Sequence, residues 1–215
     1  MTQVGKFITV EGTEGVGKST NIDFVRKLLE LRGIEVVVTR EPGGTPLAEQ
    51  LRDLLLAKRD EPFNATAELL VVFAARAQHL NHVIIPALDA GKWVLCDRFT
   101  DATFAYQGAG RGLNSQTIAT LETLVQSGRQ PDLTLLLDID VKIGLQRASE
   151  RAELDRFESE QIEFFERVRA GYRARVVEQP SRFAVVNAGR DLAAVQHDIS
   201  TAFDSFFKNL EHSAN

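Results

Sequence analysis

One eight-residue string near the N-terminus constrains the fold of this 215-residue chain more than any other feature. Residues 12–19 fit the pattern G-x-x-x-x-G-K-[ST], directly after an apolar run at 7–11 and at the start of a segment of helical period. In that context the glycines let backbone N–H groups turn toward phosphate oxygens, Lys18 supplies a point charge, and the Ser19 hydroxyl can ligate Mg²⁺. We therefore expect a site for the phosphates of ATP. Its predicted residues are Gly12, Thr13, Glu14, Gly15, Val16, Gly17, Lys18 and Ser19.

Short apolar runs alternate with longer segments of helical period along the whole chain. This alternation predicts the α/β class: a five-stranded, doubly wound parallel sheet with helices on both faces. The chain shows no composition break, so we expect a single domain over 1–215, with a charged excursion at about 147–160. The expected strands are 7–11, 34–39, 93–97, 133–139 and 183–187. The expected helices lie near 22–29, 45–55, 64–88, 115–127, 141–151, 158–178 and 192–210.

Composition and charge narrow the partners of the chain. The sequence is 44% hydrophobic, and its formal net charge of -5 argues against wholesale nucleic-acid binding, which usually needs a basic surplus. The N-terminus has no apolar signal region, and the longest apolar run, 69–75, is far shorter than the ~18 residues of a membrane span. We therefore expect a cytoplasmic protein that binds neither membrane nor nucleic acid. The single cysteine, Cys96, lies in a predicted strand, where a buried structural role is expected.

A metal ion bound with the nucleotide needs a carboxylate in addition to the Ser19 hydroxyl, at the end of a strand near the phosphate loop. Asp97 and Asp138 both end predicted strands. We prefer Asp97, because the adjacent Arg98 can hold a second anion beside the metal, and we expect Asp138 to cap its strand. The predicted metal ligands are thus Ser19 and Asp97, and the predicted cofactor is Mg²⁺.

Three further strings, taken with the phosphate loop, resemble the bacterial thymidylate kinase (dTMP kinase) family over essentially the whole chain. They are Thr-Arg-Glu-Pro-Gly-Gly-Thr at 39–45, Asp-Arg-Phe at 97–99 with Tyr-Gln-Gly at 106–108, and Leu-Asp-Arg at 154–156. The string at 39–45 is the most specific, because many nucleotide kinases share the phosphate loop and the Asp-Arg pair. The resemblance implies a P-loop nucleotide kinase fold with strands in the order second, third, first, fourth, fifth, a mobile lid and a homodimer. It also implies transfer of the γ-phosphoryl group of ATP to dTMP, which gives dTDP and ADP for dTTP synthesis.

The resemblance further implies roles for individual residues. Arg98 is similar to the arginine that holds the acceptor phosphate, and Arg76 to the donor to the thymine carbonyl. Glu14 matches the acidic residue that holds the 3′-hydroxyl of the deoxyribose. The other positions that match nucleotide contacts are Arg52, Thr103 and Gln107.

The platform for the thymine ring departs from the family pattern. Many relatives carry an aromatic residue four positions before the arginine matched by Arg76, whereas here that position is Val72 and Phe73 lies three positions before. Both spacings can share one helix face. We expect Phe73 to stack on the base, with plain core packing as the alternative.

The phosphate loop has no basic residue at 13–16, so the resemblance implies that arginines of the lid stabilise charge. The expected catalytic residues are Lys18, Arg98, Arg147, Arg151 and Arg156. Arg147 and Arg151 share a helix face by their four-residue spacing, but position 149 is serine where some relatives are basic, which leaves the dominant arginine open. The alternative is a solvated face on which these arginines pair with Glu150, Glu153 and Asp155.

Two other functions compete with this hypothesis. One is a kinase of the same architecture for another nucleoside monophosphate, and the other is a P-loop switch without a second substrate. The Asn-Lys-x-Asp string that reads guanine in GTPases is absent from the sequence. His79 and His82 have helical spacing, but no carboxylate or cysteine completes a metal set in the sequence, so structural or surface roles are expected for both.

Overall fold

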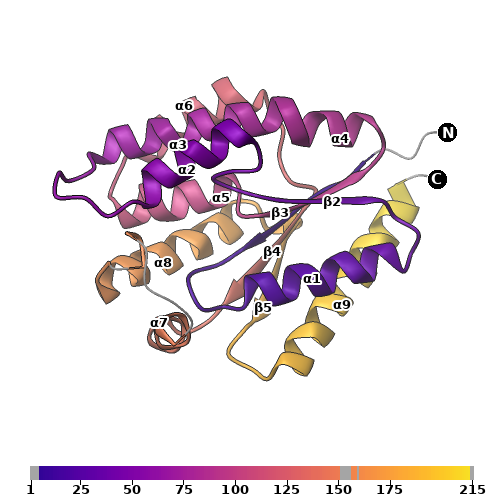
Figure 1. The fold of residues 1–215 in the computed structure, drawn as a ribbon. Helices are drawn as coiled ribbons and strands as arrows, with labels where there is room; N and C mark the ends of the chain where they lie inside the picture. The colour runs from indigo at the N-terminus through magenta and orange to yellow at the C-terminus, as the bar shows by residue number, and fades with distance from the viewer. Residues whose placement is uncertain (1–4, 151–155, 159, 214–215) are drawn as a thin grey trace.

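The chain forms a parallel sheet with helices on both faces (Figure 1). The structure is a computed structural model, and it describes residues 5–150, 156–158 and 160–213. Within these residues, five strands lie in the order β2-β3-β1-β4-β5, and all neighbours are parallel. The predicted class, topology and strand order are confirmed. The strands are β1 (Phe7–Glu11), β2 (Val36–Arg40), β3 (Trp93–Asp97), β4 (Leu133–Asp138) and β5 (Phe183–Asn187).

The helical elements fill the connections between the strands, as the periodicity predicts for βαβ units. Those of the N-terminal half are α1 (Lys18–Glu30), α2 (Pro46–Leu56), α3 (Ala65–His79), η1 (Leu80–Ile84), α4 (Ile85–Asp89), α5 (Thr100–Thr103) and η2 (Phe104–Gly110). Those of the C-terminal half are α6 (Ser115–Gln126), α7 (Val141–Ser149), α8 (Ile162–Glu178), η3 (Pro180–Arg182) and α9 (Leu192–Ser213).

The hydrophobic core has a layer on each face of the sheet. On one face, α1 and α9 lie beside each other, and side chains such as Val25 and Phe203 pack on the strands (Figure 1). On the other face, η1 and α4 pack against β1 and β3, while α8 and η2 pack beside β4. The three inner strands are buried almost throughout, and the edge strands β2 and β5 are partly exposed.

Side-chain caps explain where several helices begin. Thr45 accepts a hydrogen bond from the backbone N–H of Ala48, and Pro46 occupies the first turn of α2, as the Thr-Pro pair predicts. Asn64 caps α3 in the same way, and Asp140 caps α7. These caps satisfy backbone donors that would otherwise lack a partner at a helix start.

Two helical regions differ from the sequence prediction. The single helix expected at 64–88 is interrupted by η1, a π-helical segment that precedes Pro86. Pro86 lacks a backbone N–H and cannot donate in a regular α-helical ladder. The second difference is the pair α5 and η2, which the sequence analysis missed because their mixture of threonine, glycine and aromatic residues has no clear helical period.

The segment Ala65–Asp89 is long and apolar enough, by length and composition alone, to cross a membrane. In the fold it comprises α3, η1 and α4, and 44% of its most apolar window is buried inside the protein. Buried Glu68 and Arg76 on α3 form ion pairs with other elements. These features are typical of a core helix of a globular domain.

Candidate active site

The phosphate loop lies at the carboxyl end of β1 and at the N-terminus of α1. Lys18 is nearly buried, and its Nζ donates to the carbonyl oxygens of Gly12 (3.3 Å) and Thr13 (3.0 Å). The open cavity beside the loop is therefore lined by a lysine and by the positive end of a helix, which is a site suited to anions. Its lining residues include all of positions 14–19, with Asp97 and Arg98 opposite.

Arg98 follows β3 and reaches the same cavity with a constrained backbone. Its φ of 66° lies in the left-handed region, which is unfavourable for an arginine and persists only where surrounding contacts hold it. The guanidinium Nη2 donates to Glu14 (2.5 Å) and to the hydroxyl of Tyr106 (2.9 Å). Burial acts to raise the pKa of Glu14, but the charges of Arg98 and Lys18 outweigh it and hold that pKa at about 2.

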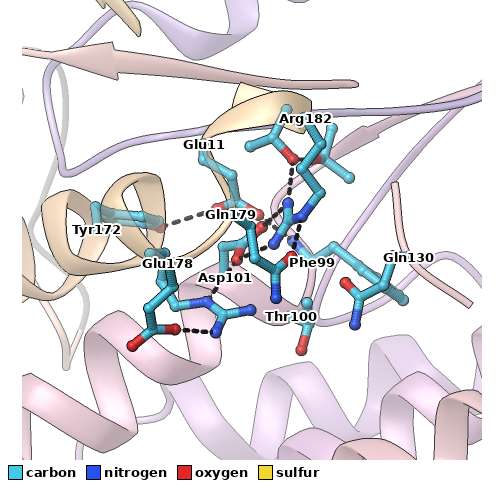
Figure 2. Close-up of polar contacts among 12 residues, drawn as sticks. Glu11, Phe99, Thr100, Asp101, Gln130, Tyr172, Glu178, Gln179 and Arg182 are labelled. Atoms are coloured by element: carbon cyan, nitrogen blue, oxygen red, sulfur yellow. Dashed lines mark hydrogen bonds and ion pairs between the residues drawn. The ribbon is translucent and has the colours of Figure 1, made fainter. Parts of the chain in front are cut away.

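A buried polar network supports the segment that follows Arg98 (Figure 2). Glu11, at the end of β1, is fully buried and accepts hydrogen bonds from the backbone N–H of Phe99 (2.7 Å) and the hydroxyl of Tyr172 (2.9 Å). Asp101 is held by two bonds from Arg182, each of 2.7 Å, and one from Arg175 (3.0 Å). Residues far apart in the sequence thus position the backbone at Arg98.

Glu11, the acidic residue of this network nearest the phosphate loop, has an unusual pKa. Burial, followed by the charge of Asp101, raises the pKa of Glu11 to about 8, although the bonds from Phe99 and Tyr172 oppose this. Glu11 and Glu14 are three residues apart, yet their pKa values move in opposite directions. The difference follows from Arg98, whose guanidinium contacts Glu14 directly.

A second cavity lies between α2, α3 and η2, and it contains a buried arginine. Arg76 donates from Nε to Glu41 (2.7 Å) and from Nη2 to Thr103 (2.8 Å). Its Nη1 is buried and has no hydrogen-bond partner within the described residues. The cavity therefore offers one strong donor to a ligand. Both Arg76 and Thr103 line this cavity, together with Gln107 and Val72.

The string at 39–45 explains the orientation of Arg76. Glu41 accepts from Arg76 with one carboxylate oxygen and lies 3.0 Å from Nδ1 of His79 with the other. Nε2 of the same histidine lies 2.6 Å from the Thr39 hydroxyl. His79 is fully buried between Glu41 and Thr39, whereas His82 is exposed.

The two cavities meet at three residues. Glu14, Arg52 and Arg98 line both the phosphate-loop cavity and the cavity at Arg76. Arg52 comes from α2 and donates to the carbonyl oxygen of Pro42 (2.9 Å). A ligand in each cavity would thus bring two anionic groups to a common wall that carries two arginines.

The fit of a divalent cation can be judged from the carboxylates at the strand ends. Asp97 lines the phosphate-loop cavity with Ser19, and its Oδ1 is buried without a hydrogen-bond partner in the described part of the chain. Asp138, the alternative, is paired with Arg169 and Arg173, each at 2.7 Å. An oxygen-only donor set of this kind suits Mg²⁺, so the residues at Asp97 fit the predicted cofactor.

Comparisons with known proteins show which family this chain resembles. Residues 10–199 match the model of the family described as thymidylate kinase. The chain is 67% identical over 202 residues to a thymidylate kinase of Teredinibacter turnerae, with 94% of this chain and 98% of that protein covered. It is 62% identical over 198 residues to one of Chromohalobacter salexigens, with 91% and 93% covered. The crystal structure of thymidylate kinase from Ehrlichia chaffeensis is similar with a TM-score of 0.76 and 34% identity, covering 93% of this chain and 98% of that one.

The chain belongs to the thymidylate kinase family. It is accordingly an ATP-dependent nucleoside monophosphate kinase that phosphorylates dTMP to dTDP. The two competing hypotheses, a P-loop switch without a second substrate and a kinase for another nucleoside monophosphate, are therefore set aside.

The structure describes two of the three predicted lid arginines, Arg147 and Arg156, and places them in different surroundings. Arg147, on α7, donates to the carbonyl oxygen of Ala188 (3.1 Å) and lines another cavity together with Val16 and Gly17 of the phosphate loop. Arg156 donates to buried Glu68 (2.7 Å) and to the carbonyl oxygen of Leu55 (2.7 Å). Arg151 lies outside the described residues, as do Glu153 and Asp155.

Phe73 does not reach the second cavity in the described structure. It is buried with Leu69 and Ile118, and the guanidinium of Arg76 lies 4.9 Å from its ring centre. Val72 lines the cavity instead. This placement favours the core-packing alternative for Phe73, because its buried ring packs against the guanidinium of Arg76 and does not line the cavity.

Several residues of the site escaped the sequence analysis. Glu41 and the buried network at Glu11 were missed because their partners are dozens of residues away in the chain. A usable signal existed for Glu41, since it lies within the quoted string at 39–45. Phe157, which lines the second cavity, has no comparable signal.

Proposed function

We propose that the phosphate-loop cavity holds the phosphates of ATP and that the cavity at Arg76 holds dTMP. The observation that carries this proposal is the shared wall of the two cavities at Glu14, Arg52 and Arg98. The acceptor phosphate then lies at Arg98, next to the terminal phosphoryl group of ATP. Such alignment is the main contribution that a protein makes to phosphoryl transfer.

The proposed mechanism needs no general base. The phosphate of dTMP is already anionic at neutral pH, so its oxygen can attack the γ-phosphorus without losing a proton to the enzyme. Lys18 and Arg98 hold the two mutually repelling anions in line and neutralise the charge that spreads over the transferred group. Arg147, Arg151 and Arg156 are proposed to add charge stabilisation from α7 and the excursion.

Ser19 and Asp97 are proposed to hold Mg²⁺. The unpartnered, buried Oδ1 of Asp97 and the hydroxyl of Ser19 at the start of α1 supply the oxygen donors. The ion would supply charge neutralisation at the donor phosphates. This assignment leaves Asp138 with its two arginines.

The cavity at Arg76 is proposed to bind the nucleoside of dTMP. Arg76 offers the free Nη1 as a donor to a thymine carbonyl, and Val72 offers an apolar surface beside the ring. Thr103 and Gln107 line the same wall. Glu14, which stays ionised at neutral pH, can accept a hydrogen bond from the 3′-hydroxyl.

We further propose that the enzyme is a cytoplasmic homodimer. The exposed leucines on α2, α3 and α6 support a dimer, because these neighbouring helices present Leu54, Leu70 and Leu124 to solvent in the single chain. No step of the proposed chemistry requires the partner subunit.

The site assignments are tested by ADP release from ATP in the presence of a panel of monophosphates. We expect ADP release to depend on the monophosphate, with dTMP turned over faster than AMP, GMP or CMP. Lys18→Ala should abolish turnover while circular dichroism and thermal unfolding remain close to native. Near-native activity of that variant would show that the phosphate-loop assignment is wrong.

A further inference from the structure

The carboxylate of Glu68 holds three groups from other parts of the chain. Glu68 lies in the first turn of α3 and is fully buried. One oxygen, Oε1, accepts from Nε2 of Gln107 (2.8 Å) and from Nε of Arg111 (3.2 Å). The other, Oε2, accepts from Nη2 of Arg156 (2.7 Å). The proposed phosphoryl-transfer chemistry includes Arg156 but gives Glu68 itself no role, and it does not explain the contact between Glu68 and Gln107.

The contact with Glu68 determines which atom Gln107 presents to a ligand. A carboxylate paired with two guanidinium groups accepts hydrogen bonds and donates none. The amide of Gln107 must therefore turn its NH₂ group toward Glu68, because the opposite orientation would bring two oxygens together. Gln107 also lines the cavity at Arg76. With one N–H used by Glu68, the amide oxygen Oε1 points away from the carboxylate, and it is the acceptor that Gln107 can offer to a ligand.

Among the polar groups of the cavity wall, Arg76 and Gln107 thus offer a donor and an acceptor to a base. The donor is Nη1 of Arg76, and the acceptor is Oε1 of Gln107. Thymine and uracil present the complementary pair, a carbonyl O4 acceptor beside the N3–H donor. Cytosine presents the reverse, an amino donor at C4 beside an N3 acceptor. A ligand that leaves buried polar groups of its site unpaired is rejected strongly.

We propose that Glu68 is a specificity-determining residue of this kinase: it fixes the amide of Gln107 with the oxygen toward the cavity, so that a base with N3–H is accepted and cytosine is rejected. Glu68 touches no substrate in this scheme and acts through Gln107 as a positioning residue. The inference rests on the proposed placement of the dTMP base in the cavity at Arg76.

The test compares kcat/KM for dTMP, dUMP and dCMP between the native enzyme and Glu68→Gln. An amide at position 68 can donate as well as accept, so the amide of Gln107 is free to turn. We expect the preference for dTMP over dCMP to fall by about tenfold, which corresponds to a cost of ~1.4 kcal/mol for leaving one buried polar group unpaired. The preference for dTMP over dUMP should not change, because the two bases share the edge that is read.

The chain offers a matched control. Oε1 of Glu122 accepts from Nε2 of Gln130 (2.9 Å), which is the same chemistry in a place outside both cavities. Glu122→Gln should leave all three kcat/KM values in their native ratios. If Glu68→Gln instead lowers the three values by one common factor, or leaves the ratio of dTMP to dCMP unchanged, the proposal is overturned.

Gln107→Leu separates this inference from the placement of the base. Loss of the preference for dTMP over dCMP in Gln107→Leu, together with a native preference in Glu68→Gln, would overturn only the role of Glu68. A native preference in Gln107→Leu would show that Gln107 does not read the base and would overturn this inference, while the placement of the base beside Arg76 would stand.

A measurement on the native protein covers the case in which Glu68→Gln does not fold. The side-chain amide protons of Gln107 can be assigned by NMR from the signals that Gln107→Leu loses. We expect one of them to stay protected from solvent exchange with and without dTMP, because it is donated to the buried carboxylate. Rapid exchange of both protons would contradict the proposed orientation.

Discussion

At the scale of single residues, two carboxylates of the phosphate loop region have opposite properties. Glu14 keeps its charge because Arg98 and Lys18 lie beside it, whereas Glu11 lies in a dry interior near a second carboxylate, Asp101. Environments that separate the pKa values of neighbouring acids are a common means of giving them different tasks. Here the ionised residue faces the cavities and the buried one supports the backbone of Phe99.

The raised pKa of Glu11 predicts a stability that depends on pH. Between the ordinary value of 4.5 and the folded value of about 8, the folded protein keeps a proton that the unfolded chain has lost. The free energy of unfolding therefore falls as the pH rises across this range. Glu11→Gln removes the titrating group, and its denaturant midpoint should vary less between pH 5 and pH 8 than the native midpoint. Parallel profiles for the two proteins would contradict the burial of a neutral Glu11.

At the scale of elements, α7 packs directly against the phosphate loop through two glycines. A Cβ built on Gly144 would lie 2.6 Å from the carbonyl oxygen of Glu14, and one built on Gly15 would collide with the backbone of Gly144. The close approach is possible because neither residue has a side chain. The position of α7, which carries Arg147, is thus tied to the position of the loop.

This contact makes Gly144→Ala an informative change. Alanine in a helix interior is normally favoured over glycine by about 1 kcal/mol, but here its methyl group meets backbone atoms that cannot turn aside. We expect a lower Tm and a higher KM for ATP, measured by thermal unfolding and steady-state kinetics. Lys142→Ala, at an exposed position of the same helix, serves as the control and should leave both values near native. A higher Tm with a native KM for ATP in Gly144→Ala would show that α7 is not packed tightly against the phosphate loop.

At the scale of the whole molecule, the single chain exposes leucines on three neighbouring helices of one face. Leu124 on α6 is 75% exposed and Leu70 on α3 is 51% exposed. We predict that Leu70→Glu weakens the proposed homodimer, because it would bury a charge in the interface. Sedimentation should show the native protein at about twice 23.8 kDa and the variant shifted toward the monomer. Leu31→Glu, at an exposed position at the end of α1, is the control and should sediment like the native protein. A native protein that sediments as a monomer would refute the proposed dimer.

The sequence alone determined the phosphate loop, the five strands and most of the helices of this protein. These features depend on local signals: the glycine spacing at 12–19, the apolar runs, and caps such as Thr45. The tertiary structure decided which polar groups meet. Phe73 supports Arg76 from the core, and Glu68 orients Gln107, because the fold brings α3 against η2. Burial of Glu11 beside Asp101 likewise requires β1 and α5 to come together, and that burial, with the charge of Asp101, raises its pKa.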